Sequence, residues 1–421
     1  MEDGKTQMTP DEQHAADFQR RNFMKMAGMV GGAGALSVAG MGSALARMVD
    51  LPFANGERHM TNSYPQKKDM ILMRNRGPLL ETPFDVYNEG VLTPNDRYFV
   101  RWHYAAIPTH VDVNTFRIKV HGAVNKPMEI SLNELIRNHK PQEFIAVNQC
   151  SGNSRGFFSP RVAGGEWANG AMGCSRWTGV PLRDILNKAG VKSGAIQVQM
   201  HGLDKTTLAS SPRFMKSLDL SHAMDGEVMV AYAMNGEPLP LLNGFPVRLV
   251  VPGWYATYWI KSLDSIEVLT SPDTNFWMKV AYTIPNTPRA NITPGQTTGF
   301  KMIPINRMVP RSFITNLHND EHVRVGHPTL VRGIAFGGDT GVAKVLFSED
   351  GGHHWHETQL EHDYGRYAFR RWHTSFKPTH GAHTLMVKCV NSKGLAQPMT
   401  PNWNPAGFMR NVVESTRVIG A

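Results

Sequence analysis

The sequence predicts an α+β domain over residues 47–300, followed by an immunoglobulin-like β-sandwich over residues 301–421. In the first part, stretches with strand-like alternation occur beside stretches of helical spacing, which is typical of an α+β protein. In the second part, short strand-like stretches are separated by Gly-rich turns, which is typical of a sandwich. The chain of 421 residues is long enough for two domains with buried cores.

The first 46 residues have the pattern of a twin-arginine signal peptide. Arg20 and Arg21 precede an aromatic and a basic residue, a weakly apolar Gly-rich stretch follows, and Ala44-Leu45-Ala46 is a small-x-small cleavage site. Such a signal is an address read by a receptor and not an anchor. We therefore expect export to the periplasm, without a stable membrane anchor.

The predicted elements of the first domain follow in chain order. Residues 47–95 are rich in Pro, Asn and Gly, so we expect them to be largely irregular. Alternation from Phe116 to His121 predicts a strand. Ser131, with Glu134 three residues later, predicts a capped helix start. Further predictions are a strand over 144–147 that leads into a turn at 150–153, a helix over 181–189 and a buried strand over 247–251.

The sandwich is predicted from strands over 331–336, 343–347 and 384–390. The histidine-rich turn at 353–356, with His362 nearby, could suggest a metal site. Side chains in a hairpin turn point outward, however, which favours a solvated turn.

Composition and charge exclude some classes of function. Hydrophobic residues make up 41% and charged residues 19%, which is typical of a globular chain and not of a disordered one. The formal net charge is +9, and removal of the signal peptide would raise it to +10. Because no dense Lys/Arg run with interleaved aromatic residues occurs, we expect no nucleic-acid partner.

Cys150 is the candidate metal ligand. It ends a predicted strand, and Arg155 follows five residues later, so a guanidinium charge would favour the thiolate that soft metals bind. Taken alone, such a cysteine is more often a small buried hydrophobe. Cys174 and Cys389 are expected to be buried free thiols, and a disulfide between them stays open.

The surroundings of Cys150 resemble the sulfite oxidase family of molybdenum enzymes. The loop from Asn148 to Arg155 is similar to the family's molybdenum-ligand loop, and Arg101-Trp102-His103 is similar to its Arg-x-His element. Three further segments match family signatures in order: residues 170–180, 244–261 and 348–355. The resemblance covers roughly residues 85–415, and the chain looks most like the bacterial periplasmic sulfite dehydrogenases of the family.

The resemblance implies a molybdenum bound by the Cys150 thiolate and by the dithiolene of one molybdopterin. Arginine and lysine suit the phosphate of such a group. At Asn243 the animal enzymes often have His, and Asn can form hydrogen bonds but cannot carry charge. The residues implied to bind the cofactor are Arg101, Trp102, His103, Cys150, Asp204, Asn243, Arg248, Trp259 and Lys261.

The resemblance also implies a sulfite site. Arg101, Arg155 and Arg410 would bind the oxyanion, since fixed guanidinium forks suit oxyanions. Trp167 would form a wall, Tyr282 would donate a hydroxyl hydrogen bond, and His103 would position Arg101. Arg410 would come from the sandwich.

The implied activity is oxidation of sulfite to sulfate. No Cys-x-x-Cys-His haem site occurs, so a c-type cytochrome is the expected electron acceptor. Two alternatives stay open: a related molybdenum subunit that acts on carrier-bound sulfane sulfur, and a cofactor-free binding module. A homodimer through the sandwich and a heterodimer with a haem subunit are both compatible with the sequence.

Overall fold

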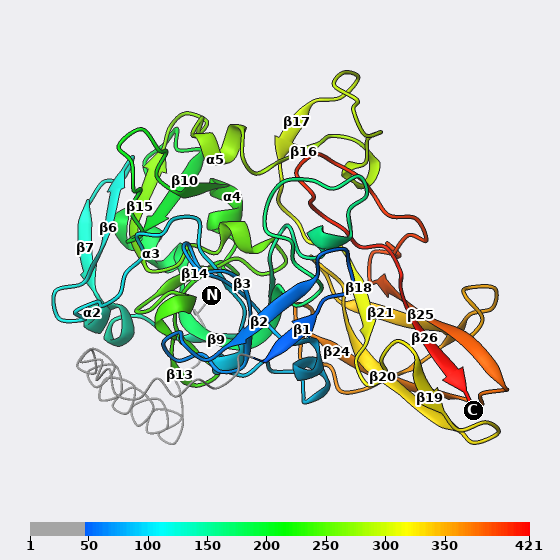
Figure 1. Cartoon of the computed structure of the whole chain (residues 1–421). Helices are drawn as coiled ribbons and strands as arrows, with labels where there is room; N and C mark the ends of the chain where they lie inside the picture. Colours follow the sequence, from blue (N-terminus) through cyan, green and yellow to red (C-terminus); the bar gives the residue numbers. More distant parts are fainter. Residues whose placement is uncertain (1–46) are drawn as a thin grey trace, which may run out of the picture.

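The computed structural model describes residues 47–421, so the predicted signal peptide lies outside the described residues. The predicted fold class is confirmed: a mixed domain rich in β-strands precedes a β-sandwich (Figure 1). Among the described residues, no helix is long and apolar enough to span a membrane.

The N-terminal region differs from expectation. Residues 47–95 were predicted to be irregular, but they form most of an antiparallel five-stranded sheet. The short strands alternate with turns rich in Pro, Asn and Gly, so the composition of the turns hides them. The strands are β1 (Met48–Asp50), β2 (Glu57–Thr61), β3 (Met70–Arg74), β4 (Leu79–Glu81) and β5 (Val100–Arg101).

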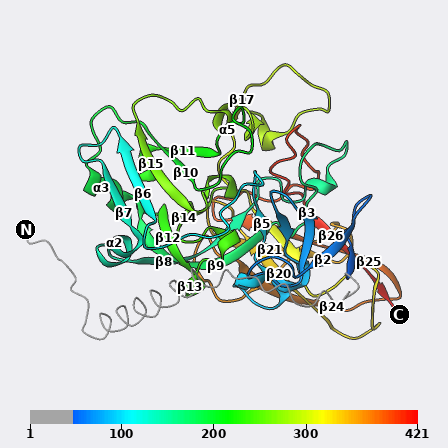
Figure 2. The ribbon, with the colours of Figure 1, turned by 60° about the vertical axis from the view of Figure 1, so that its left-hand side comes forward.

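A second sheet lies at the far side of the mixed domain from the sandwich (Figures 1 and 2). Its strands in spatial order are β11 (Met215–Asp219), β10 (Gln197–Gly202), β15 (Leu263–Leu269), β6 (Arg117–Gly122) and β7 (Met128–Ser131). The predicted alternation of β6 is observed, since Ile118 and Val120 are buried between polar neighbours. The predicted capping box is also present, with Glu134 and Ser131 bonding each other's backbone at the start of α2 (Leu132–Arg137).

The third sheet carries the cysteine loop. Its order is β13 (Glu237–Pro238), β12 (Met229–Met234), β9 (Met172–Pro181) and β8 (Gln142–Gln149), with β14 (Arg248–Val250) also paired to β12. The remaining helices are α3 (Leu182–Ala189), α4 (Leu220–Ala223) and α5 (Phe276–Lys279). Single 3-10 turns are η1 (Phe84–Asn88), η2 (Asn95–Arg97), η3 (Arg155–Phe157), η4 (Leu241–Asn243), η5 (Ala256–Tyr258) and η6 (Pro288–Ala290).

A projecting hairpin of β16 (Thr283–Pro285) and β17 (Met302–Pro304) precedes the sandwich. One sandwich sheet has the order β18 (Arg311–Ile314), β20 (Thr329–Phe336), β24 (Arg370–Phe376) and β23 (Gln359–Leu360). The other has the order β19 (Glu321–Val323), β26 (Glu414–Gly420), β25 (Gly381–Asn391), β21 (Val342–Ser348) and β22 (His356–Glu357). The main hydrophobic core includes Phe313, Phe336 and Phe408, so it continues from the mixed domain into the chain beyond residue 301.

Candidate cofactor and substrate site

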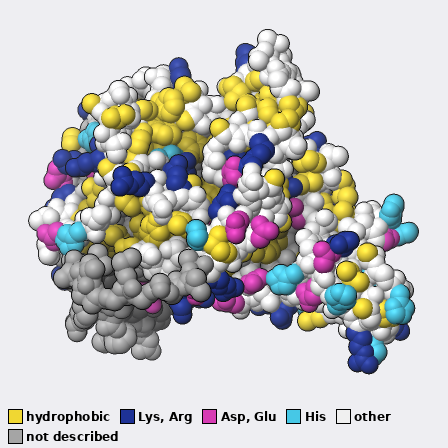
Figure 3. Space-filling model, viewed as in Figure 1, with side chains coloured by type: hydrophobic (Ala, Val, Ile, Leu, Met, Phe, Trp, Pro, Cys, Tyr) yellow, Lys and Arg dark blue, Asp and Glu magenta, His cyan; other side chains and the backbone are white. Residues whose placement is uncertain are grey.

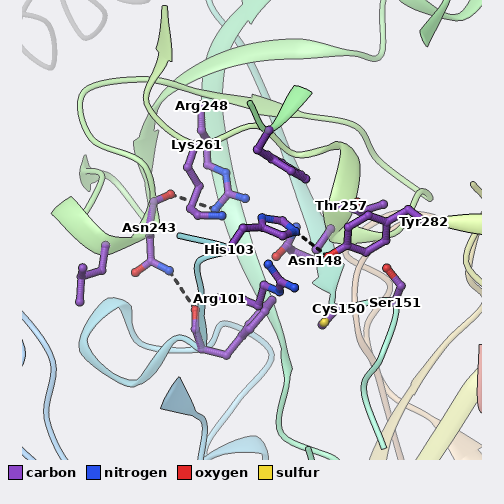
Figure 4. A pocket seen from close by; sticks show the side chains of 14 residues that line it. Arg101, His103, Asn148, Cys150, Ser151, Asn243, Arg248, Thr257, Lys261 and Tyr282 are labelled. Atoms are coloured by element: carbon purple, nitrogen blue, oxygen red, sulfur yellow. Dashed lines mark hydrogen bonds between the residues drawn. The ribbon is translucent and has the colours of Figure 1, made fainter. Parts of the chain in front are cut away.

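Cys150 lies directly after β8, in a loop with a defined backbone. Its N–H donates to the Ala171 carbonyl at 2.9 Å, and its carbonyl accepts from the Asn153 N–H at 3.0 Å. The Asn153 side chain bonds the Ala171 N–H and the Asn169 carbonyl at 2.9 and 3.1 Å. Because these bonds fix the loop to the neighbouring segment at 169–171, the thiol is presented to an internal cavity (Figure 4).

The empty space of this inner cavity, counted together with its opening to solvent, is about 470 Å³, and residues from separate parts of the chain line it. Arg101 and His103 come from β5 and the turn after it, Cys150 comes from the β8 loop, and Lys261 and Tyr282 come from later segments. Figure 4 shows these side chains around one space, with the sulfur of Cys150 beside Tyr282 and Arg101. The fold thus brings together residues that the sequence places far apart.

The inner cavity is electropositive. Arg101, Arg248 and Lys261 line it, and no carboxylate within residues 47–421 does. Burial and the Arg248 charge lower the pKa of Lys261 to about 7, and burial lowers the pKa of Arg248 to about 10. Asp204, which lies outside the lining, is buried and has a raised pKa, with Lys261 acting against that rise. Unpaired cations at such a depth favour an anionic ligand.

Asn243 is fixed from behind by a lysine that sequence reasoning missed. The Lys67 ammonium donates to the Asn243 side-chain oxygen at 2.6 Å and to the Asn95 and Tyr98 carbonyls at 2.6 and 3.0 Å. The Asn243 amide donates to the Phe99 carbonyl at 3.0 Å. No motif surrounds Lys67, so only the tertiary contacts reveal it.

Trp102 and Trp259 do not line the inner cavity; they support the residues that do. The Lys261 ammonium lies 4.6 Å from the Trp102 ring centroid, and the Arg248 guanidinium lies 5.7 Å from the Trp259 centroid. Both indoles are buried and donate to backbone carbonyls, of Leu242 and Trp254 respectively. Their role in this structure is to pack against the cations.

A second, outer cavity adjoins the first and shares Arg101 and Tyr282 with it. Its empty space, counted together with its opening to solvent, is about 730 Å³, and its lining adds Arg74, Arg155 and Trp167. Arg155 donates to the Gly165 and Ala406 carbonyls at 3.1 Å each, which fixes its guanidinium. The predicted substrate residues Arg101, Arg155, Trp167 and Tyr282 therefore surround one path to the inner cavity.

His103 and Tyr282 form a pair at the junction of the cavities. The His103 Nε2 lies 2.7 Å from the Tyr282 hydroxyl, and the imidazole stacks on Phe214 with centroids 3.8 Å apart. Burial and the neighbouring Arg101 charge lower the pKa of His103 well below its usual value, so the imidazole is neutral. Burial raises the pKa of Tyr282, which remains a neutral phenol.

Arg410 does not join these residues, contrary to the sequence prediction. Its guanidinium pairs with Glu414 and lies 4.9 Å from the centroid of the Phe157 ring, and it lines neither cavity. Glu414 also pairs with the fully buried Arg311 at 3.0 Å. The carboxylate therefore directs Arg410 toward the sandwich and away from the substrate path.

The histidine-rich turn is exposed. His354 Nδ1 lies 2.6 Å from the Asp350 carboxylate, and hydrogen bonds from the turn lower the pKa of Asp350. Figure 3 shows histidines gathered over the free end of the sandwich. Within residues 47–421, no three His, Cys, Asp or Glu side chains cluster in a way that could hold a metal ion, and the three cysteines are buried and free.

Comparison with known families gives two matches. Residues 104–277 match the oxidoreductase molybdopterin binding domain, and residues 303–419 match the Mo-co oxidoreductase dimerisation domain.

Several individual proteins are similar in sequence to this chain. The mitochondrial sulfite oxidase of Mus musculus is 32% identical over 79% of this chain and 62% of its own length, and that of Homo sapiens gives the same three values. The nitrate reductase of Spinacia oleracea is 28% identical over 81% of this chain. The chain thus spans less than two thirds of the length of these relatives.

The fold is also similar to that of a solved structure. The crystal structure of the sulfane dehydrogenase SoxCD from Paracoccus pantotrophus superposes with a TM-score of 0.68, at 22% identity, over 91% of this chain and 93% of that chain.

The residues of the inner cavity fit a molybdenum–molybdopterin group. Arg101 Nη1, Asn148 Nδ2, Ser151 Oγ and Arg248 Nε are buried and have no hydrogen-bond partner among the described residues. Buried donors without partners cost free energy, so a ligand rich in acceptors is expected beside them. A phosphate-bearing pterin supplies both acceptors and negative charge, and the Cys150 thiol faces the same space.

Proposed function

This chain belongs to the sulfite oxidase family of molybdenum oxidoreductases, and from that premise we propose that it oxidises sulfite to sulfate and passes the electrons to a c-type cytochrome. The observation that carries the proposal is the pair of adjoining cavities. The inner one has unpaired cations and a cysteine, and the outer one has arginines suited to a small oxyanion.

The cofactor would lie in the inner cavity. Arg248 and Lys261 would bind its phosphate, Asn243 would contact the pterin, and Cys150 would ligate the metal. When bound, the group supplies a two-electron redox centre and the oxygen that sulfite gains. The protein orients the cofactor and sulfite relative to each other and excludes water from the site.

The substrate residues have separate tasks. Arg101 and Arg155 bind sulfite oxygens, because each guanidinium has donors in a fixed fork. Trp167 closes one side of the path and limits the size of the anion. The neutral His103 fixes the Tyr282 hydroxyl at 2.7 Å, so that this hydroxyl can donate to the bound oxyanion.

We also propose a periplasmic location and a c-type cytochrome as the electron acceptor. The twin-arginine pattern supports export of the folded protein to the periplasm, where c-type cytochromes are the natural one-electron acceptors. Two assemblies are compatible with this proposal: a homodimer formed through the sandwich, and a heterodimer with a haem subunit.

The test is sulfite-dependent reduction of ferricyanide by the molybdenum-replete protein. Activity in the parent, its loss in Cys150→Ser and its retention in Cys174→Ser are expected, because Cys174 is buried away from both cavities. A molybdenum-replete parent that is inactive with sulfite but active with carrier-bound sulfane sulfur would replace sulfite by that substrate. A purified protein that binds no molybdenum would instead point to a binding module.

A further inference from the structure

Arg74 is the one arginine of the outer cavity that the proposed function does not use. It is the last residue of β3 and lines the cavity together with Arg101 and Arg155. Like the inner cavity, the outer cavity has no carboxylate among the described residues that line it.

The Arg74 guanidinium is fixed to the segment that carries Arg101 and His103. Its Nε donates to the Gly77 carbonyl at 3.2 Å, and its Nη2 donates to the Trp102 carbonyl at 3.3 Å. Gly77 has φ +55°, and a Cβ there would lie 3.1 Å from both Arg74 Nη2 and the His103 carbonyl oxygen. The turn after β3 therefore packs against this segment in a way that favours glycine.

Part of the guanidinium remains available. Arg74 has no ion pair with any described carboxylate, and its Nη1 makes no hydrogen bond within residues 47–421. Burial and the like charge of Arg101 both lower the pKa of Arg74. An anion placed between the two guanidinium groups would relieve this repulsion.

We propose that Arg74 is a third oxyanion-binding residue, which receives the anion at the mouth of the outer cavity and transfers it to Arg101 and Arg155. Arg74 would supply the third oxyanion-binding guanidinium group, a role that the sequence analysis assigned to Arg410. The identity of the anion as sulfite rests on the proposed function, whereas the binding of a small sulfur oxyanion by Arg74 does not.

The first test compares Arg74→Gln, Arg74→Lys and Arg76→Gln in sulfite-dependent ferricyanide reduction. Arg76 is the matched control, because it is exposed, carries the same charge two residues away and lines neither cavity. Loss of one charge-assisted contact is expected to raise the KM for sulfite about tenfold in Arg74→Gln, with kcat within about twofold. Lysine should restore part of the loss, and Arg76→Gln should match the parent. Equal KM values in the parent and Arg74→Gln, or equal shifts in Arg74→Gln and Arg76→Gln, would overturn the inference.

The second test uses sulfate alone, titrated calorimetrically into the molybdenum-replete protein. Weaker binding in Arg74→Gln than in Arg76→Gln supports the anion site, even if the parent does not oxidise sulfite. Weaker sulfate binding in Arg74→Gln together with no sulfite oxidation by the parent would contradict the proposed substrate, but it would retain Arg74 as an anion-binding residue. Sulfate binding that is the same in Arg74→Gln and the parent contradicts the inference, whatever the activity.

Discussion

Arg248 lines the inner cavity, and no acidic side chain among the described residues lines it beside Arg248. Its Nη1 and Nη2 donate to the Asn243 and Trp259 carbonyls at 3.0 and 3.2 Å, while its Nε has no partner. Arg248→Gln is expected to lower the molybdopterin content about tenfold, because a charge-assisted contact to phosphate is lost. The amounts of molybdenum and of pterin bound per protein molecule measure this loss of cofactor. Arg307→Gln, which removes an exposed arginine, should retain the parent content; equal loss in both variants would contradict the assignment.

Lys216 should make stability depend on pH. Its side chain is fully buried, with one bond to the Trp277 carbonyl at 2.8 Å, and burial lowers its pKa to about 7. Between this value and the ordinary value of 10.5, the unfolded state retains a proton that the folded state releases, so stability rises with pH. The parent should gain up to about 1.4 kcal/mol per pH unit relative to Lys216→Met from pH 7 to 9. Denaturant unfolding of both proteins measures the difference, and a constant difference would refute the prediction.

Sequence motifs predicted the residues that line the inner cavity better than they predicted the residues that hold these side chains in position. The segments around Arg101, Cys150 and Lys261 carry recognisable patterns, and the structure gathers them around the inner cavity. Lys67 and Arg74 lie in a region whose turns hide the strands, so no local signal marks them. Arg410 lies close in sequence to Glu414, and the ion pair between them is visible only in the structure.

At the scale of elements, the cysteine loop depends on a strand of the sandwich. Arg311 on β18 donates to the Ser154 hydroxyl at 2.9 Å and to the Asn169 side chain at 3.3 Å, and it pairs with Glu414. Ser154 lies in the loop after Cys150 and has a left-handed backbone, which these contacts stabilise. The sandwich domain therefore supports the proposed metal ligand through Arg311, which itself lines neither cavity.

Arg311→Met tests this support. Because the change removes the buried cation that Glu414 and Ser154 share, it is expected to cost about 3 kcal/mol of unfolding free energy and to lower molybdenum retention. Urea unfolding and metal analysis measure the two effects. Arg417→Met, on the exposed side of β26, is the control and should change neither. A parent-like molybdenum content in Arg311→Met would show that the loop does not need the sandwich.

The elements themselves were predicted well where the local pattern is strong. Alternation identified β6, strand-like stretches between Gly-rich turns identified β20, β21 and β25, and the Ser131 capping box identified the start of α2. The sheet of β1 to β5 escaped prediction because its strands have two to five residues and pair only through tertiary contacts.

At the scale of the molecule, the proposal requires a folded protein to be exported. Replacing Arg20 and Arg21 by lysine is expected to retain the precursor in the cytoplasm, since the receptor reads the arginine pair. Sulfite-dependent activity should then move from the periplasmic to the cytoplasmic fraction without loss of molybdenum. Unchanged periplasmic activity would contradict the proposed location.

The most direct test of the whole account is X-ray absorption at the molybdenum edge of the purified protein. We predict that Cys150→Ser has one sulfur neighbour fewer at the metal than the parent, while its pterin content remains similar. The same number of sulfur neighbours in both proteins would contradict the assignment of Cys150 as the metal ligand, and with it the function built around the inner cavity.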